Sequence, residues 1–217
     1  MKTILCYGDS NTWGYNPRGG RYDHRTRWPM VMASLLNGAD SPAGSETGYW
    51  VVEEGLNGRT SCLEDPIEGD RNGLRQLVPI LRSHRPLDLV ILMLGTNDLK
   101  NRFNPSAYDV SHGAQLVAKA ILASETGPED GAPRVLMVAP PPLADAPAFR
   151  QILAPDSVEI SRRLAPYYRA CAKECGAAFF DAAAVVQSSS VDGVHWEAAG
   201  HAAFAAAMAG EVRTLLG

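Results

Sequence analysis

The sequence has little excess charge of either sign and no long apolar run, and both shortages exclude classes of protein. Its 217 residues carry 20 Lys and Arg against 24 Asp and Glu, which gives a net charge of −4. A mild acidic excess argues against a nucleic-acid partner, because nucleic-acid binders carry a basic patch or stripe. The most hydrophobic run, Leu89–Leu94, is far below the ~20 residues that cross a bilayer. We therefore expect neither a nucleic-acid nor a membrane partner.

Cysteines are also few, and their spacing is not that of a metal site. Cys171 and Cys175 lie four residues apart in a helical pattern, and Cys6 and Cys62 stand alone. Without a second pair of ligands, reduced thiols are the simpler explanation. The opening segment Met1–Cys6 is too short for a signal-peptide core of ~7–15 apolar residues. The glycine motifs of nucleotide-binding proteins are absent. We expect a cytoplasmic protein with no metal and no cofactor.

Apolar runs of strand length alternate with segments of helical period along the whole chain. The predicted strands are Thr3–Tyr7, Trp50–Glu54, Leu89–Leu94, Val135–Ala139 and Ala178–Asp181. The predicted helices are Pro29–Asn37, Asn72–His84, Pro105–Ser124, Ser157–Cys175 and Ala198–Leu216. Such alternation is typical of right-handed βαβ units. We expect one α/β domain over residues 1–217, a flavodoxin-like three-layer α/β/α sandwich with a five-stranded parallel sheet.

Two long surface loops are expected between these elements. The Gly- and Ser-rich segment Asn37–Gly48 and the Pro-rich segment Pro140–Pro155 lack both helical and strand periodicity. Either loop could shape a pocket or a contact between subunits.

Polar residues gather where the predicted strands end and before the last helix. The four segments concerned are Asp9–Asn11, Gly55–Arg59, Gly95–Asp98 and Asp192–His195. Because open parallel sheets bind ligands beyond the carboxyl ends of their strands, these segments can converge on one rim. Together they supply a hydroxyl, an imidazole, a carboxylate and several N–H donors.

That inventory is what acyl transfer needs. A serine hydroxyl is a weak nucleophile, so a histidine must take its proton and a carboxylate must orient the ring. Ser10, His195 and Asp192 can fill these roles. The oxyanion then needs fixed donors, which the Ser10 N–H, the Gly58 N–H and the Asn97 side-chain amide can supply. Alone, each residue has an ordinary explanation, since serine caps helices and Asp-Gly forms turns; the four segments together are far more specific.

In order and spacing, the four segments resemble the conserved blocks of the SGNH (GDSL-type) hydrolases. The matching blocks are Gly8–Thr12, Gly55–Thr60, Gly95–Asp98 and Asp192–His195. More narrowly, three longer segments look like the small bacterial arylesterase/acyltransferase subgroup. These segments are Cys6–Gly14, Glu53–Leu56 and Asp88–Asp98.

The resemblance implies a flavodoxin-like hydrolase with Ser10 as nucleophile, His195 as base and Asp192 as the partner of that base. It also implies an oxyanion hole from Ser10, Gly58 and Asn97, short-acyl ester substrates, and in some members acyl transfer to alcohols or peroxide. A homo-oligomer is expected, because several of these relatives form one. Asn11 stands where the family usually has Leu or Ile, a change that bears on specificity rather than on mechanism.

Aromatic residues near the proposed site in sequence predict the substrate pocket. Trp13, Tyr15, Trp28 and Trp196 could wall an apolar acyl or aryl site, although core packing also explains Trp28 and Trp196. We expect Asn11, Trp13 and Trp196 in the pocket, and Asp9 as an acceptor that fixes the turn at Ser10.

Other functions remain open from the sequence alone. They are a carbohydrate O-acetylesterase, a thioesterase or lysophospholipase, and a catalytically silent flavodoxin-like module that binds a ligand or partner.

Overall fold

The computed structural model describes residues 1–38 and 48–217, so most of the predicted loop Asn37–Gly48 lies outside the described residues. The strands are β1 (Lys2–Gly8), β2 (Tyr49–Gly55), β3 (Leu89–Met93), β4 (Arg134–Ala139) and β5 (Ala178–Asp181). They form one five-stranded sheet in the order β2-β1-β3-β4-β5. Every pair is parallel. The predicted parallel sheet is confirmed.

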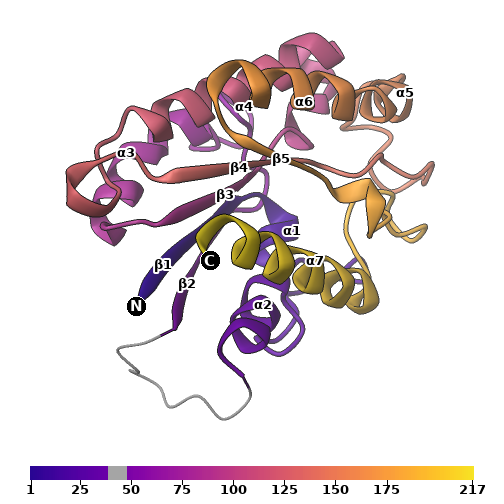
Figure 1. The fold of residues 1–217 in the computed structure, drawn as a ribbon. Coiled ribbons are helices and arrows are strands. Elements are labelled where there is room, and N and C mark those ends of the chain that lie inside the picture. The colour runs from indigo at the N-terminus through magenta and orange to yellow at the C-terminus, as the bar shows by residue number, and fades with distance from the viewer. Residues whose placement is uncertain (39–47) are drawn as a thin grey trace.

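Helices cover both faces of this sheet (Figure 1). The α-helices are α1 (Ser10–Trp13), α2 (Trp28–Asn37), α3 (Gly73–His84), α4 (Ala107–Leu122), α5 (Ser157–Arg162), α6 (Leu164–Cys175) and α7 (Ala198–Leu216). Short 3-10 helices are η1 (Asn97–Leu99), η2 (Asn101–Phe103), η3 (Pro128–Asp130) and η4 (Ala182–Ala184). No helix among the described residues is long and apolar enough to span a membrane.

The core is divided by the sheet into two halves, as the alternation of strand side chains requires. Leu5 and Val90 belong to the half beneath α3, α4 and α6. Their neighbours Ile4 and Ile91 belong to the other half, beneath α2 and α7. Because β3 is buried along its whole length, it reads as a continuous apolar run rather than an alternating one. This is the three-layer α/β/α sandwich expected from the sequence.

The predicted helix Ser157–Cys175 is wrong as a single element, because it breaks at Arg163 into α5 and α6. Pro166 explains the break. Its ring nitrogen carries no hydrogen for the carbonyl of Arg162, and its ring would clash with that carbonyl in a continuous helix. Arg162 is accordingly the last residue of α5.

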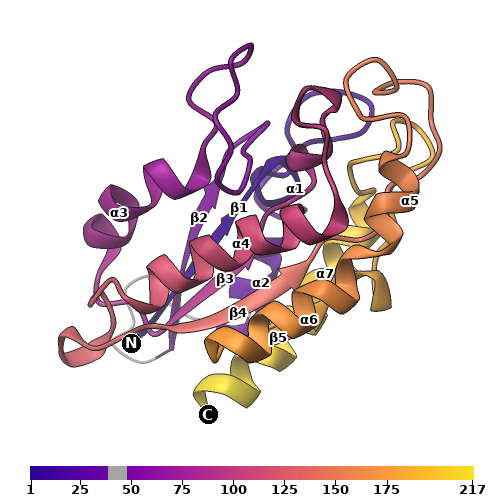
Figure 2. The same ribbon diagram turned by 90° about the horizontal axis from the view of Figure 1, so that it is seen from above.

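The segments that follow the strands lie together at one end of the sandwich, away from both termini (Figure 2). The predicted loop Pro140–Pro155 contains no helix or strand. It is fastened to η1 and η2 by backbone bonds, from Asn101 N to Ile152 O at 2.8 Å and from Ala154 N to Leu99 O at 2.9 Å. The Pro140–Pro155 loop is therefore fixed against the segments that follow β3.

Candidate active site

Ser10 is presented by a sharp turn at the end of β1. Asp9 caps the short helix α1, and its carboxylate accepts the Asn11 N–H at 3.0 Å. Burial raises the pKa of Asp9 to about 6, against the lowering effects of that hydrogen bond and of nearby His195. The expectation that Asp9 fixes the turn is confirmed, and Ser10 lies as the first residue of α1.

Asp192 and His195 are joined by a tight turn before α7. One carboxylate oxygen of Asp192 accepts the backbone N–H groups of Val194 and His195, each at 2.9 Å. The other lies 2.6 Å from His195 Nδ1. The turn needs glycine at its second position, because Gly193 has φ +83° and a Cβ there would come 2.5 Å from the carbonyl oxygen of Ala144. The pKa of Asp192 is lowered, since these hydrogen bonds outweigh the raising effect of burial.

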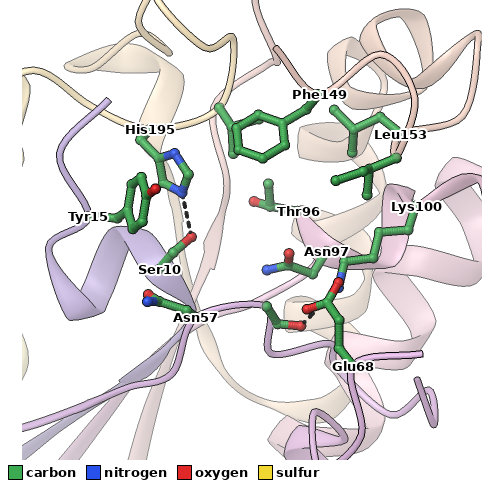
Figure 3. A pocket seen from close by; sticks show the side chains of 13 residues that line it. Ser10, Tyr15, Asn57, Glu68, Thr96, Asn97, Lys100, Phe149, Leu153 and His195 are labelled. Carbon is green, nitrogen blue, oxygen red and sulfur yellow. Dashed lines mark hydrogen bonds and ion pairs between the residues drawn. The ribbon is translucent and has the colours of Figure 1, made fainter. Parts of the chain in front are cut away.

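The side chains of Ser10 and His195 point toward each other (Figure 3). His195 Nε2 lies 2.9 Å from Ser10 Oγ. All three side chains of the predicted set therefore form one continuous hydrogen-bonded chain from Ser10 through His195 to Asp192. In this arrangement the imidazole can accept the hydroxyl proton on one side while the carboxylate holds its other nitrogen.

Two aromatic rings flank the imidazole. The ring centroid of Tyr15 lies 4.3 Å from that of His195, and that of Phe149 lies 5.8 Å away. Together with the hydrogen bond to Asp192, these contacts restrict the rotation of the imidazole.

The predicted oxyanion donors lie around the same space. Gly58 and Asn97 line the pocket that also contains Ser10. The side-chain nitrogen of Asn97 is buried and has no hydrogen-bond partner in the described part of the chain. A buried amide left without an acceptor costs about 1–3 kcal/mol, which is tolerated where an incoming ligand supplies the acceptor. Gly58 has φ +78°, a left-handed conformation that favours glycine.

Hydrogen bonds fasten the Gly58 segment to the neighbouring strand ends. The Arg59 guanidinium donates to the carbonyls of Gly8, at 2.8 Å, and Glu54. The Asp98 carboxylate accepts the backbone N–H of Ser61 at 3.0 Å, and also its hydroxyl. Burial raises the pKa of Asp98 to about 6 although these bonds lower it. Segments distant in sequence are thus held together by polar contacts inside the fold.

The pocket has a volume of about 180 Å³ and two kinds of wall. Its apolar wall consists of Tyr15, Phe149, Ile152, Leu153 and Val194. Its polar wall consists of Ser10, Asn57, Gly58, Glu68, Thr96, Asn97, Lys100 and His195. Figure 3 shows Phe149 and Leu153 on one side, with Glu68 and Lys100 beyond Asn97.

The predicted pocket residues are placed elsewhere. The described residues that line this pocket do not include Asn11, Trp13 or Trp196. The Asn11 amide donates to the carbonyl of Val194 at 3.3 Å, so it stabilises the turn that carries His195. Trp196 is fully buried in the core with its ring 5.0 Å from Phe204. The ring of Trp13 instead faces the guanidinium of Arg21 at 4.8 Å.

Sequence reasoning missed the residues that form most of the apolar wall. Phe149, Ile152 and Leu153 all come from the Pro140–Pro155 loop, which was expected to shape a pocket or a subunit contact. The signal in the sequence was a group of large apolar side chains in a Pro- and Ala-rich segment, which holds Leu143 as well as these three. Glu68 and Lys100 gave no signal, because lone charged residues in loops are ordinarily solvated.

Comparisons with known proteins identify the family of the chain. Residues 6–203 match the model of the GDSL-like lipase/acylhydrolase family. A search of the curated proteins finds no match.

Solved structures supply the nearer relatives. The chain is similar to Est24, a carbohydrate acetylesterase from Sinorhizobium meliloti, at 36% identity and a TM-score of 0.91, covering 100% of both chains. It is similar to the aryl esterase of M. smegmatis at 37% identity and a TM-score of 0.89, again over 100% of both chains. A lipase/acylhydrolase from Enterococcus faecalis, at 16% identity and a TM-score of 0.66, covers 99% of this chain and 96% of its own and shares the fold. The chain therefore belongs to the GDSL-like lipase/acylhydrolase family and, as its four sequence blocks predict, is an esterase of the SGNH type.

Proposed function

We propose that the protein cleaves small, short-acyl carboxylic esters through an acyl-enzyme on Ser10. The observation that carries this proposal is the continuous chain from Ser10 Oγ through His195 to Asp192. It ends in the same pocket as the side-chain nitrogen of Asn97, which has no hydrogen-bond partner among the described residues.

In the first half of the proposed reaction, His195 Nε2 takes the hydroxyl proton as Ser10 Oγ forms a bond to the ester carbonyl carbon. The carbonyl oxygen becomes an oxyanion and accepts hydrogen bonds from the Asn97 amide and the Gly58 and Ser10 N–H groups. Asp192 stabilises the imidazolium and keeps its ring oriented. When the bond to the alkoxy oxygen breaks, His195 gives its proton to the departing alcohol.

In the second half, water takes the place of the alcohol. His195 removes a proton from the water as its oxygen attacks the acyl carbon, and the bond to Ser10 Oγ breaks with the proton returned to that oxygen. The carboxylic acid leaves and the free enzyme is restored. An alcohol or hydrogen peroxide that entered instead of water would receive the acyl group by the same steps.

The size of the pocket supports a short acyl chain. Its volume of about 180 Å³ is below the ~300–1,000 Å³ of pockets that hold drug-sized ligands. The apolar wall is suited to an acetyl or slightly longer acyl group.

A carbohydrate O-acetylesterase is the second candidate. Its support is the similarity to the carbohydrate acetylesterase Est24 together with the polar wall that includes Asn57 and Glu68, whose oxygens can accept hydrogen bonds from sugar hydroxyls. A panel of p-nitrophenyl esters from acetate to octanoate, compared with acetylated sugars, separates these functions. A steep preference for octanoate would indicate a thioesterase or lysophospholipase instead.

The nucleophile is tested by Ser10→Ala, with Ser83→Ala as its control because Ser83 is an exposed helical serine. We expect Ser10→Ala to abolish hydrolysis of p-nitrophenyl acetate and Ser83→Ala to retain it. Activity of Ser10→Ala within about tenfold of the wild type would contradict the proposal, because loss of a triad serine costs about 10⁶-fold.

We also propose that the enzyme is a cytoplasmic homo-oligomer able to transfer acyl groups. Adding an alcohol to the ester panel measures transfer against hydrolysis. Light scattering coupled to size exclusion measures the oligomeric state, and a monomer at assay concentration would contradict it. The structure describes all four cysteines as free thiols, namely Cys6, Cys62, Cys171 and Cys175. Free thiols support a reducing compartment.

A further inference from the structure

A buried lysine lies at the polar wall of the pocket. The side chain of Lys100 is 4% exposed, and its Nζ lies 2.9 Å from the fully buried Asp65 carboxylate and 2.7 Å from Glu68. The same nitrogen donates to the carbonyl oxygen of Gly58 at 3.4 Å. All three ammonium protons therefore have acceptors, which is the condition for burying such a charge.

The cluster is a closed network of opposite charges. Arg102 also contacts both carboxylates, at 3.0 Å from Asp65 and 2.7 Å from Glu68. Hydrogen bonds from Lys100 and from the backbone of Glu68 and Ile67 outweigh the effect of burial and lower the pKa of Asp65 to about 2. Lys100 and Arg102 thus each contact both acids, and Glu68 also lies 3.7 Å from the guanidinium of Arg71. Of Lys100 and Arg102, Lys100 is the one that donates to Gly58.

Lys100 joins the two segments that carry the proposed oxyanion donors. Its backbone N–H donates to the carbonyl of Asn97 at 3.4 Å, at the end of η1. Its side chain reaches across to Gly58, whose neighbours form a loop rather than a strand or helix. Figure 3 shows Lys100 and Glu68 on this side of Asn97.

Regular secondary structure does not fix the distance between Gly58 and Asn97. Gly58 lies in a left-handed turn, and η1 is a 3-10 helix of three residues. Donors stabilise an oxyanion only when they are already in place as the charge develops. The contacts of Lys100 with Gly58 and Asn97 can therefore hold the two donors in place before the oxyanion forms.

We propose that Lys100 is a positioning residue that holds the Gly58 turn in register with Asn97, with Asp65 and Glu68 as its anchors. This inference rests on the proposed function of the site. Lys100 acts through Gly58 and Asn97 and takes no proton from the substrate.

The network provides a matched control for the test. Lys100→Met and Arg102→Met each remove one cation from the same two carboxylates and leave the other in place. Only Lys100→Met also removes a contact to Gly58, and Arg102 is not among the described residues that line the pocket. A purely structural role would therefore give the two variants similar kinetics.

The measurements are kcat and KM for p-nitrophenyl acetate, the melting temperature, and inhibition by an aryl trifluoromethyl ketone, whose adduct with serine places an oxyanion in the hole. We expect Lys100→Met to lower kcat about 10- to 100-fold, less than outright loss of a donor. Its KM should stay within about threefold, and its inhibition constant should rise in parallel with the loss of kcat. Arg102→Met should retain kcat within about threefold.

Two results would overturn the inference: equal kcat in the two variants, or a loss in Lys100→Met confined to KM. If Lys100→Met does not fold, Lys100→Gln replaces it with the same expected split, since its shorter polar side chain also loses Gly58. Ser10→Ala distinguishes a failure of the proposed function from a failure of the role of Lys100. An active Ser10→Ala enzyme would refute the proposed function, whereas an inactive one beside a fully active Lys100→Met enzyme would refute only the role of Lys100.

Discussion

The ring of Tyr15 lies against the imidazole of His195, with centroids 4.3 Å apart and planes inclined by 32°. Tyr15 comes from the segment just after α1, which begins at Ser10, whereas His195 belongs to the turn before α7. The contact therefore links an early and a late segment of the chain beside the hydrogen bond between Ser10 and His195. It also makes Tyr15 part of the pocket wall.

The aromatic ring of Tyr15, rather than its hydroxyl, should support catalysis. Tyr15→Phe keeps the ring and should retain kcat within about twofold, whereas Tyr15→Ala frees the imidazole and should lower kcat about tenfold, since small misplacements of reacting groups are costly. Steady-state kinetics on p-nitrophenyl acetate checks both. Equal losses in the two variants would show that the hydroxyl is what matters.

Asn97 should contribute to rate but not to stability. Its amide nitrogen is buried and unpartnered among the described residues, so its removal takes away a desolvation penalty. Asn97→Ala should lower kcat about 10²- to 10³-fold while the free energy of unfolding stays equal or rises. Asn101→Ala, in the exposed part of η2, is the control and should leave kcat unchanged. A destabilised Asn97→Ala protein with normal kcat would contradict the role of oxyanion donor.

Phe149 should limit the acyl chain. Its ring lines the pocket and lies 5.8 Å from that of His195. Phe149→Ala should therefore shift the ratio of kcat/KM for p-nitrophenyl butyrate over acetate about tenfold toward butyrate, because each added methylene is worth about 1–3 kcal/mol in an apolar pocket. Leu116→Ala, on an exposed face of α4, should leave this ratio unchanged. An unchanged ratio in Phe149→Ala would place the acyl group elsewhere in the pocket.

His201 should destabilise the fold in acid. It is fully buried, and neither ring nitrogen has a partner in the part of the chain that the structure describes. Burial, with smaller effects of His195 and Arg27, lowers its pKa from 6.5 to about 4. Between these values the unfolded chain binds more protons, so the contribution of His201 to the free energy of unfolding falls as pH drops through this range.

Two carboxylates act in the opposite direction. Burial raises the pKa values of Asp9 and Asp98 from 3.8 to about 6, so below pH 6 the folded state binds the extra protons and gains stability.

The contribution of His201 is separated from that of the carboxylates by comparing variants. From pH 7 to pH 4.5, His201→Phe should gain about 2 kcal/mol relative to the wild type in urea unfolding. Exposed His24→Gln should follow the wild type, and a constant difference between His201→Phe and wild type would contradict the burial argument.

The sequence predicted the sheet and the hydrogen-bonded set of Ser10, His195 and Asp192 because both depend on local signals. Strand ends are marked by Gly8 and Gly95, and the Asp192–His195 turn is contained within four residues. Trp196 was misplaced because nearness in sequence does not tell which way a side chain points, and it points into the core away from His195. Phe149 and Lys100 depend on how loops cross over the sheet, which no periodicity encodes.

The most direct test of an acyl-enzyme on Ser10 is to find the residue that becomes covalently modified. The folded protein would be treated with a fluorophosphonate, digested, and mapped by mass spectrometry, with Ser10→Ala treated in parallel. We expect one label on the peptide that contains Ser10, loss of esterase activity in proportion to labelling, and no label in Ser10→Ala. Stoichiometric labelling of a different residue, or full activity after Ser10 is modified, would contradict it.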